Sequence, residues 1–269
     1  MSKLRQKHVG IIGGGTMGSA IARLLAAKES GSMCLIFDRN MERRKALAES
    51  STAVAGTLDE LMEKSDIVVL AVKPQDVKEL FEQVYEKIKP SHLVVSIMAG
   101  ISIGAIARGL GTKRVIRSMP NTPAQIGKGM TVWTANQSVD NENKEAARFL
   151  FSLLGRELEV DSEDKIDAAT AVSGSGPAYL FLLAEALENG ACQLGFSSKE
   201  SEIIVRETLR GASELYAQSP ESPAILRSRV TSKGGITEAS MAVLDPPNFI
   251  DLWRRAVKRA YDRSKKLNK

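Results

Sequence analysis

Residues 9–18 decide the fold: Val9-Gly10-Ile11-Ile12 is a short apolar run that breaks into Gly13-Gly14-Gly15-Thr16-Met17-Gly18. Helical spacing of apolar residues follows from Ala20. A G-x-G-x-x-G pattern between a strand and a helix is typical of a dinucleotide-binding turn. Gly13 permits the tight turn, Gly15 lets the backbone approach a pyrophosphate, and Gly18 lets helix and strand pack closely. The N–H groups and the positive dipole end of the helix favour the phosphate charge.

The second apolar run, Met33 to Phe37, ends in Asp38-Arg39-Asn40, about twenty residues after the glycine turn. This position faces the ribose 2′ group. An aspartate there accepts hydrogen bonds from a 2′-OH and favours NAD, whereas an arginine pairs with a 2′-phosphate and favours NADP. We predict NADPH as the cofactor and leave NADH open. Arg43 and Arg44 follow, and they either raise the local positive potential or form a solvated helix face.

Composition indicates an ordinary globular protein. The 269 residues are 43% hydrophobic and 26% charged, which allows two domains or one large one. The sequence has neither an apolar run approaching the roughly 20 residues that span a bilayer nor a signal-peptide apolar region at its start. Cys34 and Cys192 have no ligand-like spacing and are predicted to be buried, reduced thiols. We therefore expect a cytoplasmic protein with no membrane partner.

The net charge of +5 does not indicate nucleic-acid binding once it is located. Residues 251–269 carry eight Lys/Arg and two Asp, so the basic excess lies in one predicted C-terminal helix. Cations suit the end of a helix dipole. The sequence has no recognisable nucleic-acid module and no aromatic residues interleaved with the charges, so we expect no nucleic-acid partner.

The sequence patterns divide the chain into two parts. Strand-like runs alternate with helical patterns in the first part, which predicts a doubly wound α/β sheet. From Ser162 onward only helical periodicity remains, and little polar patterning accompanies it, so this all-α domain is expected to bury its surface against another subunit. Residues 176–191 suggest a helix packed closely on all sides. We predict a dinucleotide-binding domain over 1–160 and a helical substrate and dimerisation domain over 161–269. The predicted strands are 9–12, 33–37, 52–55, 66–72, 92–97, 113–117 and 130–135, and the predicted helices of the first domain include 41–50, 58–64 and 76–88.

Ligands of a doubly wound sheet bind outside the carboxyl ends of its strands. Three loops qualify: residues 71–74, 98–100 and 118–123, of which the first two are predicted to line the ribose and nicotinamide. Lys73 is either catalytic or a residue on the rim of the cleft. The predicted cofactor-binding residues are Ile12, Gly13, Gly14, Gly15, Thr16, Met17, Asp38, Arg39, Ala71, Val72, Lys73, Pro74, Ile97, Met98 and Ala99.

The number and positions of the histidines argue against several catalytic mechanisms. The only two, His8 and His92, each precede a predicted strand, so neither should reach the carboxyl ends. Acid–base catalysis by histidine, a Ser-His-Asp triad and a histidine metal cluster are therefore not expected. A reaction that needs only hydride delivery, orientation and a weak proton donor remains.

The chain resembles the pyrroline-5-carboxylate reductase family over essentially its whole length. The resemblance implies a Rossmann domain, and a helical domain that interlocks with a partner in a dimer, often assembled into rings. It also implies NAD(P)H-dependent reduction of the small cyclic imine 1-pyrroline-5-carboxylate to L-proline. The matching segments are Ile11–Met17, Ala71–Gln75, Arg117–Pro123, Ser173–Tyr179 and Val230–Thr237.

The resemblance also implies residue roles. Thr237 would be catalytic by hydrogen-bonding the imine or amine nitrogen, and Ser232 would hold the substrate carboxylate. Backbone N–H groups around Gly234, Gly235 and Ile236 would hold the same carboxylate, as glycine-rich helix starts do for anions. Thr237 has the alternative role of a simple helix-start residue.

Two further residues are assigned to the substrate by the resemblance. Glu163 matches an acidic residue near the family's substrate pocket, or it is a helix-start carboxylate favoured by the dipole. Asn121 lies in the loop 118–123 and belongs to the matching segment Arg117–Pro123. The chain departs from the family at Lys233, Ile236 and Ser240, where the family usually has proline, threonine or alanine, and a small residue respectively. These departures bear on substrate breadth.

Two other functions compete. A related imine or β-hydroxyacid reductase would share the cofactor domain, but β-hydroxyacid types place a catalytic lysine on the long helix where this chain has Ser173–Tyr179. A non-catalytic nucleotide-binding paralogue with a regulatory role is the other alternative. Retention of Thr237, Ser232 and Asn121 argues against it.

Overall fold

The computed structural model describes residues 7–27, 34–49, 54, 56–244, 246 and 248–267. The chain forms two compact units, one of residues 1–175 with 260–269 and the other of residues 176–259. The first unit extends past residue 160 because α7 (Glu163–Ala169) contacts β5 and β6 of its sheet.

The first unit is built on one sheet, which has seven strands among the described residues in the order β2-β1-β3-β4-β5-β6-β7. All neighbouring strands are parallel except β5 and β6. The central strands β1, β3 and β4 are buried along their whole length, as continuous apolar runs in parallel sheets usually are. The strands are β1 (Val9–Ile12), β2 (Cys34–Phe37), β3 (Ile67–Leu70), β4 (Leu93–Ser96), β5 (Val115–Pro120), β6 (Gly129–Ala135) and β7 (Gly155–Glu159).

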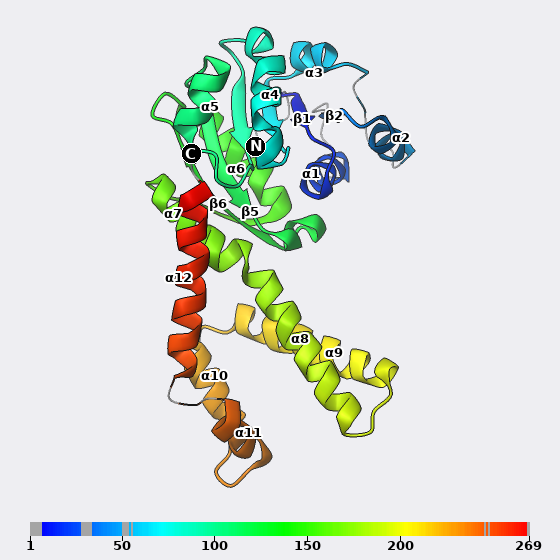
Figure 1. Cartoon of the computed structure of the whole chain (residues 1–269), viewed down its shortest axis with the longest axis vertical. Coiled ribbons are helices and arrows are strands. Elements are labelled where there is room, and N and C mark those ends of the chain that lie inside the picture. Colours follow the sequence, from blue (N-terminus) through cyan, green and yellow to red (C-terminus); the bar gives the residue numbers. More distant parts are fainter. Residues whose placement is uncertain are drawn as a thin grey trace. The chain divides into compact units, whose positions relative to one another are not determined.

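Helices cover both faces of this sheet, which confirms the predicted doubly wound α/β fold (Figure 1). Successive strand residues point to opposite faces. Ile11 accordingly packs in a core with Ile21 and Leu150 of α1 and α6, while Ile12 packs in a second core with Leu61 and Ile106 of α3 and α5. The helices are α1 (Thr16–Ala27), α2 (Met41–Glu49), α3 (Leu58–Lys64), α4 (Val77–Val84), α5 (Ile103–Leu110), α6 (Asn141–Leu154) and α7.

Some boundaries differ from the sequence predictions. Of the strand predicted over 52–55 only Val54 is described, and it makes a single bridge to Ile36; the other three residues lie outside the described residues, as do Met33 and Ser50. β5 begins and ends later than predicted and reaches Pro120. Strand β7 was not predicted, because its sequence Gly-Arg-Glu-Leu-Glu has no apolar run. Its carboxylates are held instead by α6 and β6, through Lys144, Arg148 and the Trp133 indole.

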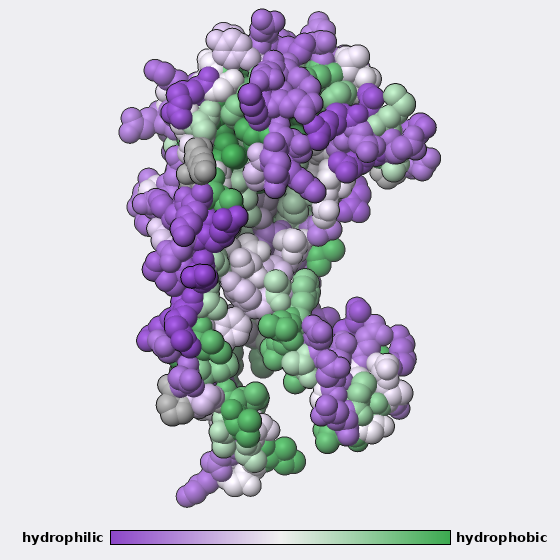
Figure 2. Space-filling view, viewed as in Figure 1, coloured by the Kyte–Doolittle hydropathy of each residue, from purple (hydrophilic) through white to green (hydrophobic). Residues whose placement is uncertain are grey.

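In the second unit the regular elements among the described residues are all helices. In this single chain α8 has no buried residue, so the prediction of a helix packed closely on all sides is wrong within the chain. Large apolar side chains lie exposed over these helices (Figure 2), as expected of a surface that another subunit covers. The helices of this unit are α8 (Gly176–Gln193), α9 (Ser198–Gln218), α10 (Pro223–Arg229), α11 (Ile236–Leu244) and the first part of α12 (Phe249–Leu267).

Neither cysteine is as buried as predicted. Both are free thiols, but only Cys34 is half-buried, and Cys192 is exposed on α8. Burial raises the pKa of the Cys34 thiol to about 12, which makes it a poor nucleophile. Among the helices of the described residues, none combines the length and apolar character that crossing a bilayer requires.

His8 and His92 precede β1 and β4, at the edge of the sheet opposite the carboxyl ends, as predicted. The His92 ring is fully buried, and its Nδ1 accepts a hydrogen bond of 3.0 Å from the Lys89 N–H. Burial, with the nearby Lys89 charge, lowers the pKa of His92 below its ordinary value. The folded chain therefore keeps this imidazole neutral where the unfolded chain takes up a proton.

The free energy of unfolding should fall as the pH drops below about 6.5, the ordinary pKa of histidine, by up to about 1.4 kcal/mol per pH unit from this one proton. Above that pH the contribution of His92 should be constant. His92→Gln should remove this part of the slope in urea titrations at about pH 7 and about pH 5. Equal slopes in the parent and the variant would show that His92 does not contribute.

Candidate active site

Of the three glycines of the G-x-G-x-x-G motif, Gly13 and Gly18 lie at positions crowded by backbone and Gly15 lies at an open one. Gly13 has φ +110°, and a Cβ on it would lie 2.6 Å from the Ala71 carbonyl oxygen. A Cβ on Gly18 would lie 1.9 Å from the Gly13 carbonyl oxygen. A Cβ on Gly15 would meet nothing within 4 Å. The fold therefore requires glycine at 13 and 18, whereas at 15 the absence of a side chain leaves open space beside the start of α1.

A cavity of about 700 Å³ opens over this turn. It brings together ten of the predicted cofactor residues: Ile12, Gly13, Gly14, Gly15, Thr16, Asp38, Arg39, Ala71, Val72 and Lys73. Five others do not line it: Met17, Pro74, Ile97, Met98 and Ala99. The lining also includes eight residues that were not predicted to bind the cofactor: Ser19, Phe37, Asn40, Arg43, Asp76, Glu79, Leu80 and Gln83. Asp76 ends the 3-10 turn η2 (Pro74–Asp76), and the last three lie on α4, some sixty residues beyond the glycine turn and in no motif.

Asp38 at the end of β2 is buried and fully engaged. Its Oδ2 accepts hydrogen bonds from the Gly14 N–H (2.8 Å) and from Arg43 Nη1 (2.9 Å), and its Oδ1 accepts one from the Asn40 N–H (2.8 Å). Burial works to raise the pKa of the Asp38 carboxyl, but the Asn40 and Gly14 N–H groups and Arg43 together hold it below its ordinary value. The ionised carboxylate therefore ties the glycine turn to β2.

Arg39 is held at the cavity by two carboxylates. Its guanidinium pairs with Asp76 at 2.7 Å and with Glu79 at 2.5 Å, and it stays more than half exposed. Arg43 also lines the cavity. Arg44 does not; it lies over the Phe37 ring at 5.3 Å and donates to the Gly56 carbonyl. Of the two arginines left open by the sequence, Arg43 alone adds charge to the cavity lining.

Two loops at the carboxyl ends are held by side chains. Lys73 is exposed where β3 leaves the sheet and lines the cavity. Asn121, after β5, uses both ends of its carboxamide: Oδ1 accepts from the Met130 N–H at 2.8 Å, and Nδ2 donates to the carbonyl and hydroxyl oxygens of Ser173, each at 3.2 Å. Asn121 thus joins the turn after β5 to the π-helical turn η5 (Thr170–Gly174).

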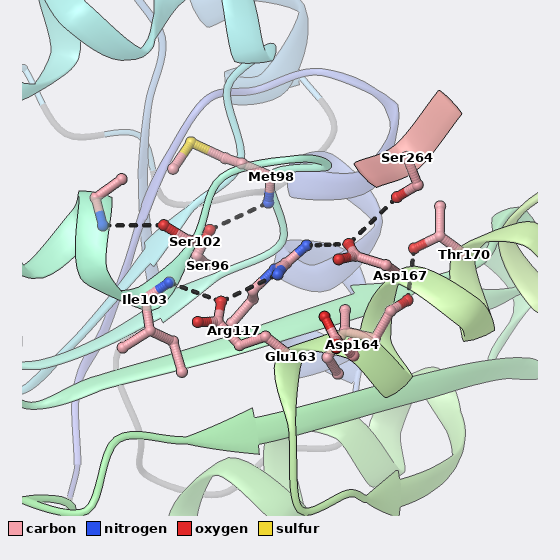
Figure 3. Close-up of polar contacts among 12 residues, drawn as sticks. Ser96, Met98, Ser102, Ile103, Arg117, Glu163, Asp164, Asp167, Thr170 and Ser264 are labelled. Atoms are coloured by element: carbon pink, nitrogen blue, oxygen red, sulfur yellow. Dashed lines mark hydrogen bonds and ion pairs between the residues drawn. The ribbon is translucent and has the colours of Figure 1, made fainter. Parts of the chain in front are cut away.

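A buried ionic cluster lies beside the loop that follows β4 (Figure 3). Arg117 of β5 is 2% exposed and pairs with Glu163 at 3.0 Å and Asp167 at 2.7 Å, both on α7. Glu163 also accepts a hydrogen bond of 2.8 Å from the Ile103 N–H, and Asp167 accepts one of 3.2 Å from the Ser264 hydroxyl. Glu163 is in the first turn of α7, one of its two predicted roles. The spacing of Glu163 and Asp167, one helical turn apart, was the signal available in the sequence.

The segment 232–237 lies in the second unit. Gly234 has φ +71°, and its N–H donates to the Glu238 carboxylate at 2.7 Å, while the Gly235 N–H donates to the Ser232 carbonyl at 3.0 Å. Two of the three N–H groups that the resemblance assigns to the substrate carboxylate, those of Gly234 and Gly235, are therefore engaged within the chain. Helix α11 begins at Ile236, so the N–H groups of the first turn have no partner within that helix. Thr237 lies half-buried in this turn.

Two family models match the chain. The model described as "Pyrroline-5-carboxylate reductase dimerisation" matches residues 163–267, and the one described as "NADP oxidoreductase coenzyme F420-dependent" matches residues 8–100. The first model covers α8 to α12, whose apolar side chains are exposed in the single chain.

Relatives match over almost the full length. A curated pyrroline-5-carboxylate reductase from Synechocystis is 38% identical over 265 residues, which cover 97% of this chain and 98% of that protein. The solved pyrroline-5-carboxylate reductase from Coxiella burnetii has a TM-score of 0.87 at 33% identity and covers 98% of this chain and 99% of its own. The Plasmodium falciparum enzyme, solved with NADP bound, has a TM-score of 0.88 at 28% identity over 99% and 100% of the two chains. This chain therefore belongs to the pyrroline-5-carboxylate reductase family.

Proposed function

We propose that this protein reduces 1-pyrroline-5-carboxylate to L-proline, with NADPH as the preferred hydride donor and NADH as a second one. The observation that carries the proposal is the match to pyrroline-5-carboxylate reductases over 97% of the chain, across both compact units. The cavity over the glycine turn supports it from the chain's own geometry.

The cavity fits a dinucleotide. Gly15 leaves open space where a Cβ would stand, and the first N–H groups of α1 have no partner within that helix, so the turn offers donors to a pyrophosphate. We assign the pyrophosphate to the residues from Gly14 to Met17. The loops 71–74 and 97–99, after β3 and β4, are assigned to the nicotinamide half. The bound reduced nicotinamide supplies the hydride that the imine carbon receives.

The preference for NADPH rests on two arginines. Arg39 and Arg43 both line the cavity beyond β2, where a ribose 2′ group is expected. A guanidinium matches the geometry of a phosphate and binds it in a bidentate manner. Asp38 already accepts three hydrogen bonds from the protein, which leaves it less able to receive a 2′-OH.

We assign the substrate to the start of α11. The substrate carboxylate would bind Ser232 and the N–H groups at Ile236 and Thr237, because a helix start favours an anion. The Thr237 hydroxyl would hydrogen-bond the ring nitrogen. Reduction adds one hydride to carbon and one proton to nitrogen, and the proton comes from solvent or through Thr237. The protonated imine is the better electrophile, so a strong protein acid is unnecessary and orientation provides most of the catalysis.

Glu163 and Asn121 are assigned a different contribution. Both side chains are engaged within the protein, Glu163 with Arg117 and Ile103 and Asn121 with Ser173 and Met130. We propose that they shape the site by holding its loops. We also propose a homodimer as the basic assembly, through the exposed apolar helices of the second unit, and a cytoplasmic location, which the two free thiols support.

Thr237→Ala should lower kcat by about a hundredfold, because the nitrogen loses its hydrogen-bond partner in the transition state. The Kd for NADPH should stay unchanged. Thr237→Ser should keep most of the activity. The matched control is Thr231→Ala, since the Thr231 hydroxyl donates to the Arg227 carbonyl in the same segment. Loss of NADPH absorbance measures turnover with pyrroline-5-carboxylate, and unchanged turnover in Thr237→Ala would remove this residue from the mechanism.

Gly15→Ala and Gly18→Ala should separate cofactor binding from folding. At position 15 the new methyl group meets no protein atom, so Tm should hold while the Kd for NADPH rises about tenfold or more. At position 18 the methyl group meets backbone, so the free energy of unfolding should fall by about 1–3 kcal/mol. Tryptophan quenching and thermal unfolding measure the two effects. Normal NADPH affinity in Gly15→Ala would contradict the placement of the pyrophosphate.

Arg39→Ala should weaken NADPH binding about tenfold and change NADH binding less than about twofold, because only the former has a 2′-phosphate. Arg44→Ala is the charge-matched control, since Arg44 lies outside the cavity lining and any effect through Phe37 should be equal for both coenzymes. The readout is the ratio of kcat/KM for the two coenzymes. An unchanged ratio in Arg39→Ala would exclude this arginine from coenzyme selection.

A further inference from the structure

Burial of the ionic cluster of Arg117, Glu163 and Asp167 costs hydration free energy. Arg117 and Asp167 are almost fully inaccessible, and charges removed from water lose hydration that their mutual attraction only partly restores. Apolar residues of similar volume would fill the same space at less cost. None of the three lines the cavity over the glycine turn. Any role of the cluster beyond stability must therefore come from the segments that its side chains hold in place.

The cluster holds one end of the loop after β4. The Glu163 carboxylate accepts the N–H of Ile103, the first residue of α5, where the loop ends. The opposite end is held by Ser96, whose Oγ accepts the Met98 N–H at 3.2 Å and whose carbonyl accepts the Ser118 hydroxyl at 2.9 Å. Ser118 follows Arg117 directly in β5 (Figure 3 shows Ser96, Met98 and Ile103 beside the cluster). Both ends of the loop are thus tied to β5 or to α7.

The middle of the same loop is covered by the end of α12. Gly100 has φ +72°, and a Cβ on it would lie 2.8 Å from Leu267 Cβ. The last turns of α12 are in turn held on α7, through the Ser264 hydroxyl on Asp167 and the Lys265 ammonium on Asp164. All these residues belong to the first compact unit. One arginine therefore connects, through two carboxylates, the loop end at Ile103 and the helix that covers Gly100.

We propose that Glu163, Asp167 and Ser264 are positioning residues that hold the loop 97–102 in the conformation that orients the nicotinamide for hydride transfer. This inference rests on the proposed function, which assigns that loop to the nicotinamide half of the coenzyme. In the sheet order β2-β1-β3-β4, Asp38 follows β2 and the glycine turn follows β1, so a dinucleotide that extends across the carboxyl ends reaches the β3 and β4 loops last. The cluster therefore lies near the loop proposed for the nicotinamide, which is the reacting half of the coenzyme. The other half, with the adenosine and phosphates, is assigned to the glycine turn and the arginines.

This positioning role should affect the orientation of the bound coenzyme and not its affinity. Most of the coenzyme's charge is assigned to the glycine turn and the arginines of the cavity, which the cluster does not touch. A loosened loop would therefore leave the KM for NADPH nearly constant and lower kcat, since a small misplacement of the reacting atoms slows the chemical step. A purely structural role would lower Tm and the amount of folded enzyme without this split.

Three variants test the proposal against one matched control. Glu163→Ala removes the acceptor for Ile103 and Arg117, whereas Glu163→Gln keeps an amide oxygen for the same donors. Ser264→Ala removes one hydroxyl from α12 with little change in volume, and it keeps the test valid if Glu163→Ala does not fold. The control is Asp161→Ala, because Asp161 lies just before α7 and pairs with Lys165 on the surface.

We expect kcat to fall about tenfold in Glu163→Ala and about threefold in Ser264→Ala, with the KM for NADPH within about twofold of the parent. The primary isotope effect with 4-deuterated NADPH should rise in both, because hydride transfer becomes more fully rate-limiting. Asp161→Ala should stay near the parent, and Glu163→Gln should lose less kcat than Glu163→Ala because the amide oxygen still accepts the Ile103 N–H. Without coenzyme, amide hydrogen exchange over residues 97–103 should speed up about tenfold in Glu163→Ala and should not change in Asp161→Ala.

The outcomes that overturn the proposal are distinct from failure of the proposed function. Unchanged exchange over residues 97–103 in both Glu163→Ala and Ser264→Ala would show that the cluster does not hold the loop, whatever the enzyme reduces. Faster exchange with unchanged kcat and isotope effect would show that the loop does not orient the coenzyme. A parent protein that binds NADPH and does not reduce pyrroline-5-carboxylate would instead refute the proposed function.

Discussion

The close approach of α1 to the turn after β1 is the constraint on which the rest of the first unit depends. The Gly13 carbonyl oxygen occupies the place where any side chain at position 18 would begin, and the Gly14 N–H is bound to the Asp38 carboxylate at the end of β2. These two contacts place the helix start over the edge of the sheet. They leave the first N–H groups of α1 and the open space at Gly15 facing one cavity. A helix start attracts an anion, and we therefore propose that this geometry binds the pyrophosphate.

The charges around this cavity are balanced by the protein itself. Asp38 is neutralised by Arg43, and Arg39 is neutralised by Asp76 and Glu79. A 2′-phosphate that binds Arg39, as we propose, would compete with the carboxylates that already hold this guanidinium, in an exposed setting where each ion pair contributes little. The proposed preference for NADPH would depend on that competition, not on the presence of an arginine alone.

In the second unit, by contrast, the helices do not bury their apolar side chains within their own chain. Apolar side chains along α8, α9 and α11 are exposed, and α8 buries none of its residues. The match of this region to a dimerisation model accounts for the exposure, because a second subunit removes this apolar surface from water. The same exposure explains why Cys192, predicted to be a buried thiol, is exposed in the single chain.

The sequence by itself determined the doubly wound sheet, the glycine turn, the helical second half and the family, because these depend on local patterns: apolar runs, a short motif and helical periodicity. It placed α3 at its observed bounds and located ten residues of the cavity. Only the tertiary structure decided the rest. Strand β7 is polar and forms because β6 and α6 provide its partners, Asp76 and Glu79 reach Arg39 from another helix, and Arg117 meets Glu163 and Asp167 across some fifty residues. Contacts of this kind join segments that are distant in the sequence and share no motif or periodicity. They therefore cannot be predicted from local patterns and depend on how the chain folds.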